Sequence, residues 1–333
     1  MLLYEITRQY KTLSVIGMCK NAGKTTAMNA LIRENGKHGG TLGLTSIGRD
    51  GESVDVVTKT HKPGIYVFRG TVIATASAML RLGDTTNRIL DTTGISTPLG
   101  EVVMVRTESD GSVQLAGPSI TSQLRSLNAA FFEHGCERVY IDGALSRKSL
   151  CAPAVSDATV LCTGASYSPN IDEVVADTSF ACTLLSLSKT EIWGDEYKER
   201  MTVCDVNGEI TAASGQETIL EAVSDRRRAR AKGLLLRGAV TDMRVNPLVS
   251  SGADIKGLRI TAEDGSKLLI SRGVYEKLLM RGAKFDVLET TKLCAVTVNP
   301  ISAYGNDFDK RELFDKMSAA VNVSVINVME AEK

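Results

Sequence analysis

Short apolar runs alternate with amphipathic segments over the first two thirds of the chain. Four runs have the composition of strands that are buried on both faces of a parallel sheet: residues 13–16, 41–47, 138–144 and 158–165. Three segments repeat apolar residues at the spacing of a helix: residues 24–35, 122–134 and 171–185. This alternation predicts an α/β fold with a mainly parallel sheet.

The pattern between residues 65 and 117 is different. Short β-rich runs are separated by turn signals such as Asp110-Gly111 and Gly117-Pro118. We expect a small β meander inserted at about residues 60–118, with one short helix near residues 75–82.

A second series of strands and helices follows the basic cluster Arg226-Arg227-Arg228-Ala229-Arg230-Ala231-Lys232. A strong hairpin signal, Asn207-Gly208, lies shortly before it. The change in composition predicts a first domain of residues 1–213, which contains the meander, and a smaller C-terminal α/β domain of residues 214–333. The length of 333 residues favours two domains, because single cores stop growing near about 250–300 residues.

The first apolar run leads directly into Gly17-Met18-Cys19-Lys20-Asn21-Ala22-Gly23-Lys24-Thr25-Thr26, and a helix follows. A strand, a small-residue loop and a helix in this order are typical of a phosphate-binding loop, because backbone N–H groups and the positive helix end point at one anion. Lys24 is expected to reach the outer phosphates, and the Thr25 hydroxyl to ligate Mg²⁺. The other expected nucleotide-binding residues are Gly17, Asn21, Ala22, Gly23 and Thr26.

The spacing of this loop departs from the usual one. Four residues normally separate the first glycine from Gly-Lys-Thr, but that position here is Met18, and Gly17 stands one residue too early. Methionine does not adopt the positive-φ conformations open to glycine, so we expect a different backbone in the first half of the loop. An ordinary strand-to-helix turn with a surface lysine is the alternative interpretation.

An acid suited to the magnesium side of such a site ends the run Val139-Tyr140-Ile141-Asp142. A carboxylate at a strand's carboxyl end, beside a phosphate loop, holds the metal directly or through water. Asp142 is therefore the expected second Mg²⁺ ligand, unless it only caps the following turn. Asp50, in the glycine-rich segment after the second strand, is a further candidate that would face the phosphates or a water molecule.

The sequence contains few other patterns typical of metal binding or catalysis. The three histidines have no metal-spaced partner, and the seven cysteines contain no C-x-x-C pair. The sequence Asp91-Thr92-Thr93-Gly94 imitates a GTPase switch, but it runs into a turn and we interpret it as structural. The absence of an Asn-Lys-x-Asp motif downstream favours ATP over GTP.

Charge and hydropathy narrow the expected partners. Lys plus Arg and Asp plus Glu both number 39, so no overall field attracts nucleic acid or a membrane, and we interpret the basic cluster as a solvated helix end. The sequence shows no signal peptide and no apolar window of about 18 residues. We therefore expect a cytoplasmic protein with reduced cysteines, and homo-oligomerisation is left open.

Several stretches together make the chain similar to a known family, the small P-loop subunit of the lysine 5,6-aminomutase reactivase. These stretches are residues 15–26, 45–52 (Thr-Ser-Ile-Gly-Arg-Asp-Gly-Glu), 93–101 (Thr-Gly-Ile-Ser-Thr-Pro-Leu-Gly-Glu), 140–144 (Tyr-Ile-Asp-Gly-Ala) and 298–300 (Val-Asn-Pro). The shifted Gly17 belongs to this pattern. The resemblance implies a P-loop ATPase that, with a MutS-like ATPase subunit, restores a cobalamin- and pyridoxal-phosphate-dependent aminomutase by cofactor exchange.

The sequence thus predicts an ATPase in which Lys24, Thr25 and Asp142 hold Mg-ATP, with Asp50 as an additional catalytic candidate. Two alternatives use the same nucleotide site. The first is a small-molecule kinase or ligase whose second domain binds the acceptor. The second is a nucleotide-binding scaffold without turnover.

Overall fold

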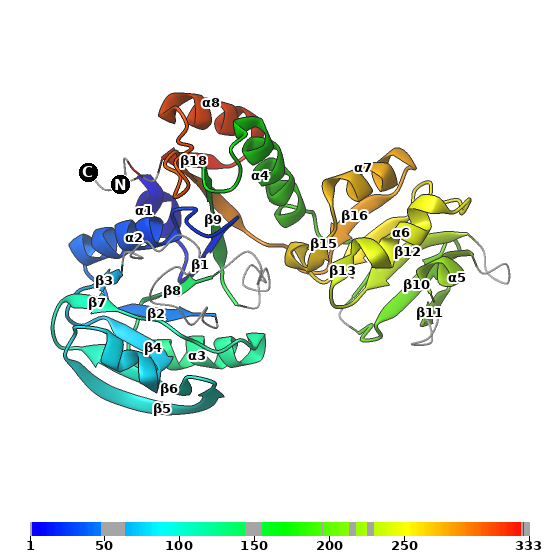
Figure 1. Ribbon diagram of the computed structural model, residues 1–333. Helices are drawn as coiled ribbons and strands as arrows, with labels where there is room; N and C mark the ends of the chain where they lie inside the picture. Colours follow the sequence, from blue (N-terminus) through cyan, green and yellow to red (C-terminus); the bar gives the residue numbers. More distant parts are fainter. Residues whose placement is uncertain are drawn as a thin grey trace. The chain divides into compact units, whose positions relative to one another are not determined.

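The computed structural model describes residues 2–47, 64–143, 155–194, 196–212, 218–224, 230–327 and 329. The chain forms two compact units (Figure 1). Unit 1 consists of Met1–Ser179 and Lys292–Lys333, and unit 2 is Phe180–Thr291. Unit 2 is therefore an insertion within the sequence of unit 1.

Unit 1 is built on one nine-stranded sheet. In spatial order its strands are β18 (Ser324–Asn327), β17 (Leu293–Asn299), β9 (Ala158–Gly164), β1 (Thr12–Gly17), β8 (Arg138–Asp142), β2 (Leu42–Ser46), β4 (Val72–Ala76), β6 (Gly100–Thr107) and β5 (Asn87–Thr97). All neighbours from β18 to β4 are parallel, whereas β6 is antiparallel to both β4 and β5. The predicted α/β class with a mainly parallel sheet is confirmed.

Helices cover both faces of this sheet, which explains the continuous apolar runs. Every residue of β1, β2, β4 and β9 is buried. In Figure 1, α2 (Lys24–His38) and α3 (Thr121–Glu133) lie on opposite sides of β2. The α3 contact is close, because a Cβ atom on Gly43 in β2 would lie 2.7 Å from a ring carbon of Phe131.

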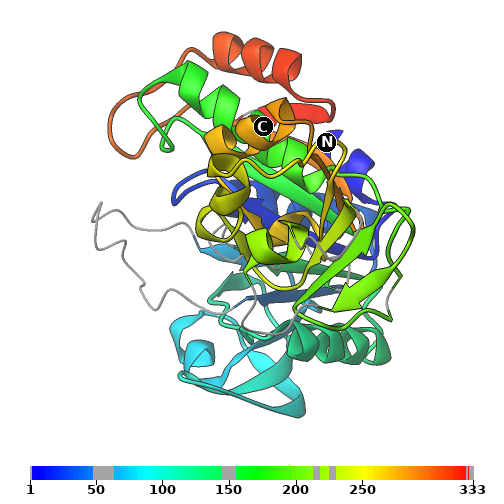
Figure 2. The ribbon, with the colours of Figure 1, turned by 90° about the vertical axis from the view of Figure 1, so that its right-hand side faces the viewer.

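Three more helices belong wholly or partly to unit 1: α1 (Leu2–Thr7), α4 (Ile171–Leu185) and α8 (Lys310–Ala320). The turned view in Figure 2 shows α4 and α8 together at one end of the sheet. The Ser179 hydroxyl of α4 donates a hydrogen bond to the carbonyl of Ala320 at the end of α8, at 2.8 Å. Helix α2 continues through Gly36 to His38, beyond the expected end at residue 35, because the glycine with positive φ that ends the helix is Gly39 (φ 77°) and not Gly36.

Only part of the expected inserted meander is separate from the main sheet. Strands β3 (Ile65–Val67) and β7 (Gly111–Val113) form their own antiparallel pair, and the short helix η1 (Ser77–Leu82) follows β4. Strand β4 instead pairs in parallel with β2, so β4, β6 and β5 extend the main sheet. The uninterrupted burial of β4 is the physical reason, because a strand buried on both faces is stabilised inside a covered sheet.

The domain boundary in the structure differs from the one expected at residues 213 and 214. Strand β17 pairs in parallel with β9, with Thr297 opposite Cys162, and β18 continues the same sheet. Residues 292–333 therefore complete unit 1. Periodicity identifies these segments as strands but carries no information about which sheet they join.

Unit 2 has its own five-stranded sheet. In spatial order the strands are β11 (Ile210–Ala212), β10 (Met201–Asp205), β12 (Ala231–Leu236), β14 (Arg259–Ala262) and β16 (Lys284–Val287). The last three are parallel, and β10 is antiparallel to β11 and β12. The predicted hairpin at Asn207-Gly208 is confirmed, and Gly208 has a φ of 85°.

The connections of unit 2 are mostly helical. They include α5 (Ile219–Ser224), the short pair β13 (Val240–Thr241) and β15 (Leu268–Leu269), α6 (Asp242–Ser250), η3 (Gly265–Lys267) and α7 (Arg272–Met280). Helix α6 was not expected from the sequence, because Pro247 lies inside it and proline normally marks a helix boundary. The buried side chains of Val245 and Leu248 anchor α6 in the core of unit 2.

Candidate functional site

The loop between β1 and α2 joins a buried strand to an uncapped helix start. Gly23, the residue before α2, has a φ of 88°, and no side chain caps the first turn. The first N–H groups of an α-helix have no acceptor within the helix, so this end of α2 is suited to bind an anion. Lys24, Thr25 and Thr26 form the first turn and are half-buried.

Gly17 is required by the path of Lys24 rather than by the turn itself. A Cβ atom on Gly17 would lie 2.9 Å from both Cγ and Cδ of Lys24 and 3.3 Å from the Cys19 carbonyl oxygen. The aliphatic part of Lys24 therefore lies back over the end of β1.

The left-handed residue in the first half of the loop is Asn21, with a φ of 60°. Asparagine adopts this conformation more readily than most side chains, which makes a glycine at position 18 unnecessary. Met18 is fixed differently: its N–H donates to the carbonyl of Cys162 in β9 at 2.8 Å. The altered glycine spacing thus corresponds to an altered loop backbone.

Asn21 also links the loop to the other side of the sheet. Its carbonyl accepts a hydrogen bond of 3.4 Å from the side-chain amide of Asn299, the last residue of β17. Its own amide nitrogen, Nδ2, is buried and has no acceptor among the residues that the structure describes. Ala22, the next expected nucleotide-binding residue, is fully buried in the core beneath the loop.

Asp142 ends β8, the strand next to β1, and is half-buried. It lies opposite Val15 on one side and opposite Ser46 of β2 on the other. Two backbone bonds of 3.0 Å continue the ladder there, from the Ile47 N–H to the Asp142 carbonyl and from the Gly143 N–H to the Val15 carbonyl. The structure thus brings Asp142 to the strand edge that leads into the loop.

The charges of both Lys24 and Asp142 affect the pKa of the buried Cys162 thiol. Burial raises its pKa to about 11, Thr297 and the positive charge of Lys24 lower it, and the negative charge of Asp142 raises it. Burial likewise raises the pKa of Cys19 to about 11, and Lys24 again opposes this shift. Lys24 and Asp142 therefore act on the same small region at the carboxyl ends of β1, β8 and β9.

The loops after β9 and β17 form a wall beside the loop between β1 and α2. Gly164 and Asn299 approach so closely that a Cβ atom on Gly164 would lie 2.1 Å from the Asn299 carbonyl oxygen. The Asn306 amide donates to the Ala165 carbonyl, and the Ala303 N–H donates to the Ser166 hydroxyl, each at 3.0 Å. These bonds give the wall a fixed shape.

Of the two remaining candidate segments, the switch-like one does not reach this region. Asp50 lies outside the described residues. Asp91, Thr93 and Gly94 lie in β5, the outermost strand. Because β8, β2, β4 and β6 separate β1 from β5, and neighbouring strands lie about 4.8 Å apart, the two strands are about 24 Å apart. The structural interpretation of the switch-like sequence agrees with this position.

Two contacts of the candidate site could not be read from the sequence. The Met18–Cys162 backbone bond depends on which strand lies beside β1, and the Asn299–Asn21 bond depends on the placement of β17. Asn299 carried one sequence signal, since it precedes a loop rich in turn residues at a strand's carboxyl end, where α/β folds place ligands.

Searches against protein-family models, curated proteins and solved structures found no match for this chain. Within the described ranges, no group of three or more His, Cys, Asp or Glu side chains is arranged to hold a metal ion. Among the described helices, none has the length and apolar character needed to span a membrane.

Proposed function

We propose that this chain binds and hydrolyses ATP at the loop between β1 and α2. The proposal rests on one arrangement: Lys24 lies back over Gly17 at the uncapped start of α2, and Asp142 ends the adjacent parallel strand. A helix N-terminus, a lysine and a strand-end carboxylate are the groups with which nucleotide-hydrolysing proteins hold phosphates and their metal ion.

Each residue has a distinct part in this proposal. The N–H groups at the start of α2 bind phosphate oxygens, and Gly17, Asn21, Ala22, Gly23 and Thr26 shape the loop around them. Lys24 neutralises charge on the outer phosphates. The buried Asn21 amide, which lacks an acceptor among the described residues, is a further donor that a small movement of the loop would offer to a phosphate.

The residues present are compatible with Mg²⁺. Thr25 supplies a hydroxyl and Asp142 a carboxylate, and Mg²⁺ is typically held by one or two protein oxygens, with water and phosphate oxygens completing its shell. When bound, Mg²⁺ would offset negative charge on the phosphate oxygens.

ATP is the preferred nucleotide in this proposal. No Asn-Lys-x-Asp sequence is present to read guanine. The amide of Asn299 is also occupied, because it donates to the Asn21 carbonyl and accepts from the Ile301 N–H at 3.1 Å.

We extend the proposal to a role in enzyme reactivation. On the resemblance to the reactivase family, ATP hydrolysis would work with a MutS-like ATPase subunit to exchange damaged cofactor in a cobalamin- and pyridoxal-phosphate-dependent aminomutase in the cytoplasm. The support for this part is the set of matching stretches in the sequence alone. Copurification of such partners from the native cell would test it.

The core of the proposal is tested by measuring ATP binding by calorimetry and phosphate release for the full chain. We expect Lys24→Ala to weaken ATP binding at least about tenfold, and Asp142→Asn to retain binding but lose most turnover. Lys37→Ala is the matched control, because Lys37 is an exposed lysine of the same helix that pairs with Glu34. Unchanged binding and turnover in Lys24→Ala would refute the proposal.

The same assay separates the two alternatives. ATP binding without phosphate release, with or without partner proteins, would identify a scaffold. Phosphoryl transfer from ATP to a metabolite in the absence of any protein partner would identify a kinase or ligase.

A further inference from the structure

Unit 2 contains a cluster of arginines at one edge of its sheet. Arg237 directly follows β12, and Glu263 directly follows β14, the parallel neighbour of β12. Arg244 lies in the first turn of α6, and Arg200 directly precedes β10. The carboxyl ends of parallel strands are the edge where α/β sheets place ligands.

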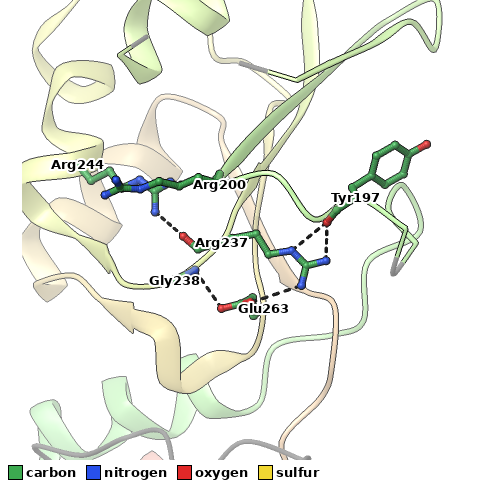
Figure 3. Close-up of polar contacts among 6 residues, drawn as sticks. All are labelled: Tyr197, Arg200, Arg237, Gly238, Arg244 and Glu263. Atoms are coloured by element: carbon green, nitrogen blue, oxygen red, sulfur yellow. Dashed lines mark hydrogen bonds and ion pairs between the residues drawn. The ribbon is translucent and has the colours of Figure 1, made fainter. Parts of the chain in front are cut away.

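Arg237 and Glu263 form an ion pair, and each also makes hydrogen bonds with backbone groups. Nε and Nη2 of Arg237 donate to the Tyr197 carbonyl at 3.0 and 2.6 Å, and Nη1 lies 3.4 Å from Oε1 of Glu263. Oε2 of Glu263 accepts the Gly238 N–H at 3.0 Å. Figure 3 shows this guanidinium group turned toward Tyr197 and Glu263. Glu263, the only carboxylate in this network of described residues, is therefore paired with Arg237.

Arg244 is held by backbone carbonyls. Its Nη1 donates to the carbonyls of Arg237 at 2.8 Å and Ala239 at 3.2 Å, and its Nη2 donates to the Arg200 carbonyl at 2.9 Å. The Arg237 N–H donates to the same Arg200 carbonyl at 3.0 Å. The guanidinium group of Arg244 and the main chain of Arg200 are thus fixed beside each other.

Arg200 and Arg244, unlike Arg237, make no ion pair with a carboxylate among the described residues, and Arg200 is exposed. Burial lowers the pKa of Arg244, and the charge of Arg200 lowers it further. Arg244 keeps its Nε–H and one Nη2–H as donors, and Arg200 keeps its whole guanidinium fork.

We propose that Arg200 and Arg244 form a binding site for a phosphate dianion, supplied as inorganic phosphate or as the phosphate monoester of a small molecule. Two guanidinium groups match the several oxygens of one phosphate group, and a dianion balances both charges. The carbonyl bonds hold Arg244 in position before a ligand arrives, which lowers the entropy cost of binding. This site belongs to unit 2 and does not depend on the proposed ATPase site.

The test measures binding of inorganic phosphate to the full chain by calorimetry at constant ionic strength. We expect the parent protein to bind phosphate, and Arg200→Ala and Arg200→Gln each to weaken binding at least about tenfold. Arg272→Ala is the matched control, because Arg272 is another part-exposed arginine of unit 2, and it should bind as the parent does. Glycerol phosphate in place of inorganic phosphate shows whether a monoester is preferred.

Thermal unfolding in phosphate-free, low-salt buffer separates a ligand role from a structural one. Removing the Arg200 charge relieves its repulsion with Arg244, so the melting temperature of Arg200→Ala should equal or exceed that of the parent. Absence of phosphate binding to the parent, or an affinity in both Arg200 variants equal to that of the parent, overturns the proposal. Equally tight binding of succinate also overturns it, because that result would indicate a general dianion surface.

Discussion

At the start of α2, the aliphatic part of Lys24 occupies the space where a side chain at position 17 would lie. Gly17 therefore leaves space for the Lys24 side chain, whereas the turn itself is formed by Asn21 and Gly23, which have positive φ. A count of residues between glycines does not detect this division of roles. The altered spacing is compatible with a loop over whose first glycine the Lys24 side chain still folds back.

We predict that Gly17→Ala displaces Lys24. The added Cβ atom would lie 2.9 Å from the Lys24 chain, so the side chain must move or the end of β1 must shift. We expect ATP affinity to fall about tenfold and the free energy of unfolding to fall by about 1–3 kcal/mol. Calorimetry and urea unfolding measure the two effects.

Gly273→Ala serves as the control for that prediction. Gly273 lies in α7, and a Cβ atom there would meet nothing within 4 Å. The substitution should leave ATP affinity unchanged and should stabilise the helix slightly. Equal effects of the two substitutions would contradict the assigned role of Gly17.

At the residue scale, sequence patterns could predict the local structural features of the candidate site. The stretch from Gly23 to Thr25 and the strand-end position of Asp142 follow from composition and order alone. The neighbours that fix the loop, Cys162 and Asn299, lie more than 130 residues away in sequence, and no local pattern could identify them. Asp50 stays a prediction, since it lies outside the described residues.

Among the elements, the end of β17 connects the outer half of the parallel sheet to the loop before α2. Asn299 donates to the Asn21 carbonyl, and it also accepts the Ile301 N–H, so one side chain orders two loops. The conformation of the loop before α2 therefore depends on a strand near the other end of the sequence.

We predict that Asn299→Ala weakens ATP binding a few-fold and lowers the free energy of unfolding by about 1 kcal/mol, because two hydrogen bonds are lost. Asn29→Ala is the control. Asn29 also makes two bonds, to the Gly64 carbonyl and from the Tyr66 N–H, each at 3.0 Å, but beside β3. It should cost similar stability without affecting ATP affinity. A matching loss of affinity in both variants would contradict the assigned link.

Element-level prediction from the sequence was most reliable for the long periodic segments. Helix α4 has the predicted bounds, and β1, β2, β8 and β9 agree to within two residues. Helix α6 was missed because tertiary burial of Val245 and Leu248 outweighs the effect of Pro247 on the helix. The role of β4 was missed because its pairing with β2 is decided by the sheet, and sequence patterns describe only the strand.

At the scale of the whole molecule, unit 1 is discontinuous in sequence. Its sheet receives β9 before the insertion and β17 and β18 after it. The described strands of unit 2, by contrast, pair only within unit 2, and they pack around a separate core.

We predict that a fragment of residues 180–291 folds on its own, whereas a fragment of residues 1–213 does not. The first fragment contains all of unit 2, and the second lacks β17, leaving one edge of the buried strand β9 unpaired. Circular dichroism with thermal unfolding should show a cooperative transition only for residues 180–291.

Residues 1–179 joined by a flexible Gly/Ser linker to residues 292–333 provide the complementary fragment, which contains every strand of the nine-stranded sheet. This fragment should regain the cooperative transition and bind ATP. Cooperative unfolding of residues 1–213 alone would show that β17 and β18 are dispensable for unit 1.

The insertion also sets the order in which the protein can fold while it is being synthesised. Domains generally fold in the order in which they leave the ribosome. Here the β1 strand and the α2 helix emerge early, but β9 gains its second neighbour only when β17 has been made. Unit 2 is complete by Thr291, so it can fold first. Unit 1 would therefore begin to be made before unit 2 but reach its native structure after it, and the candidate nucleotide site would form only once β17 has been made.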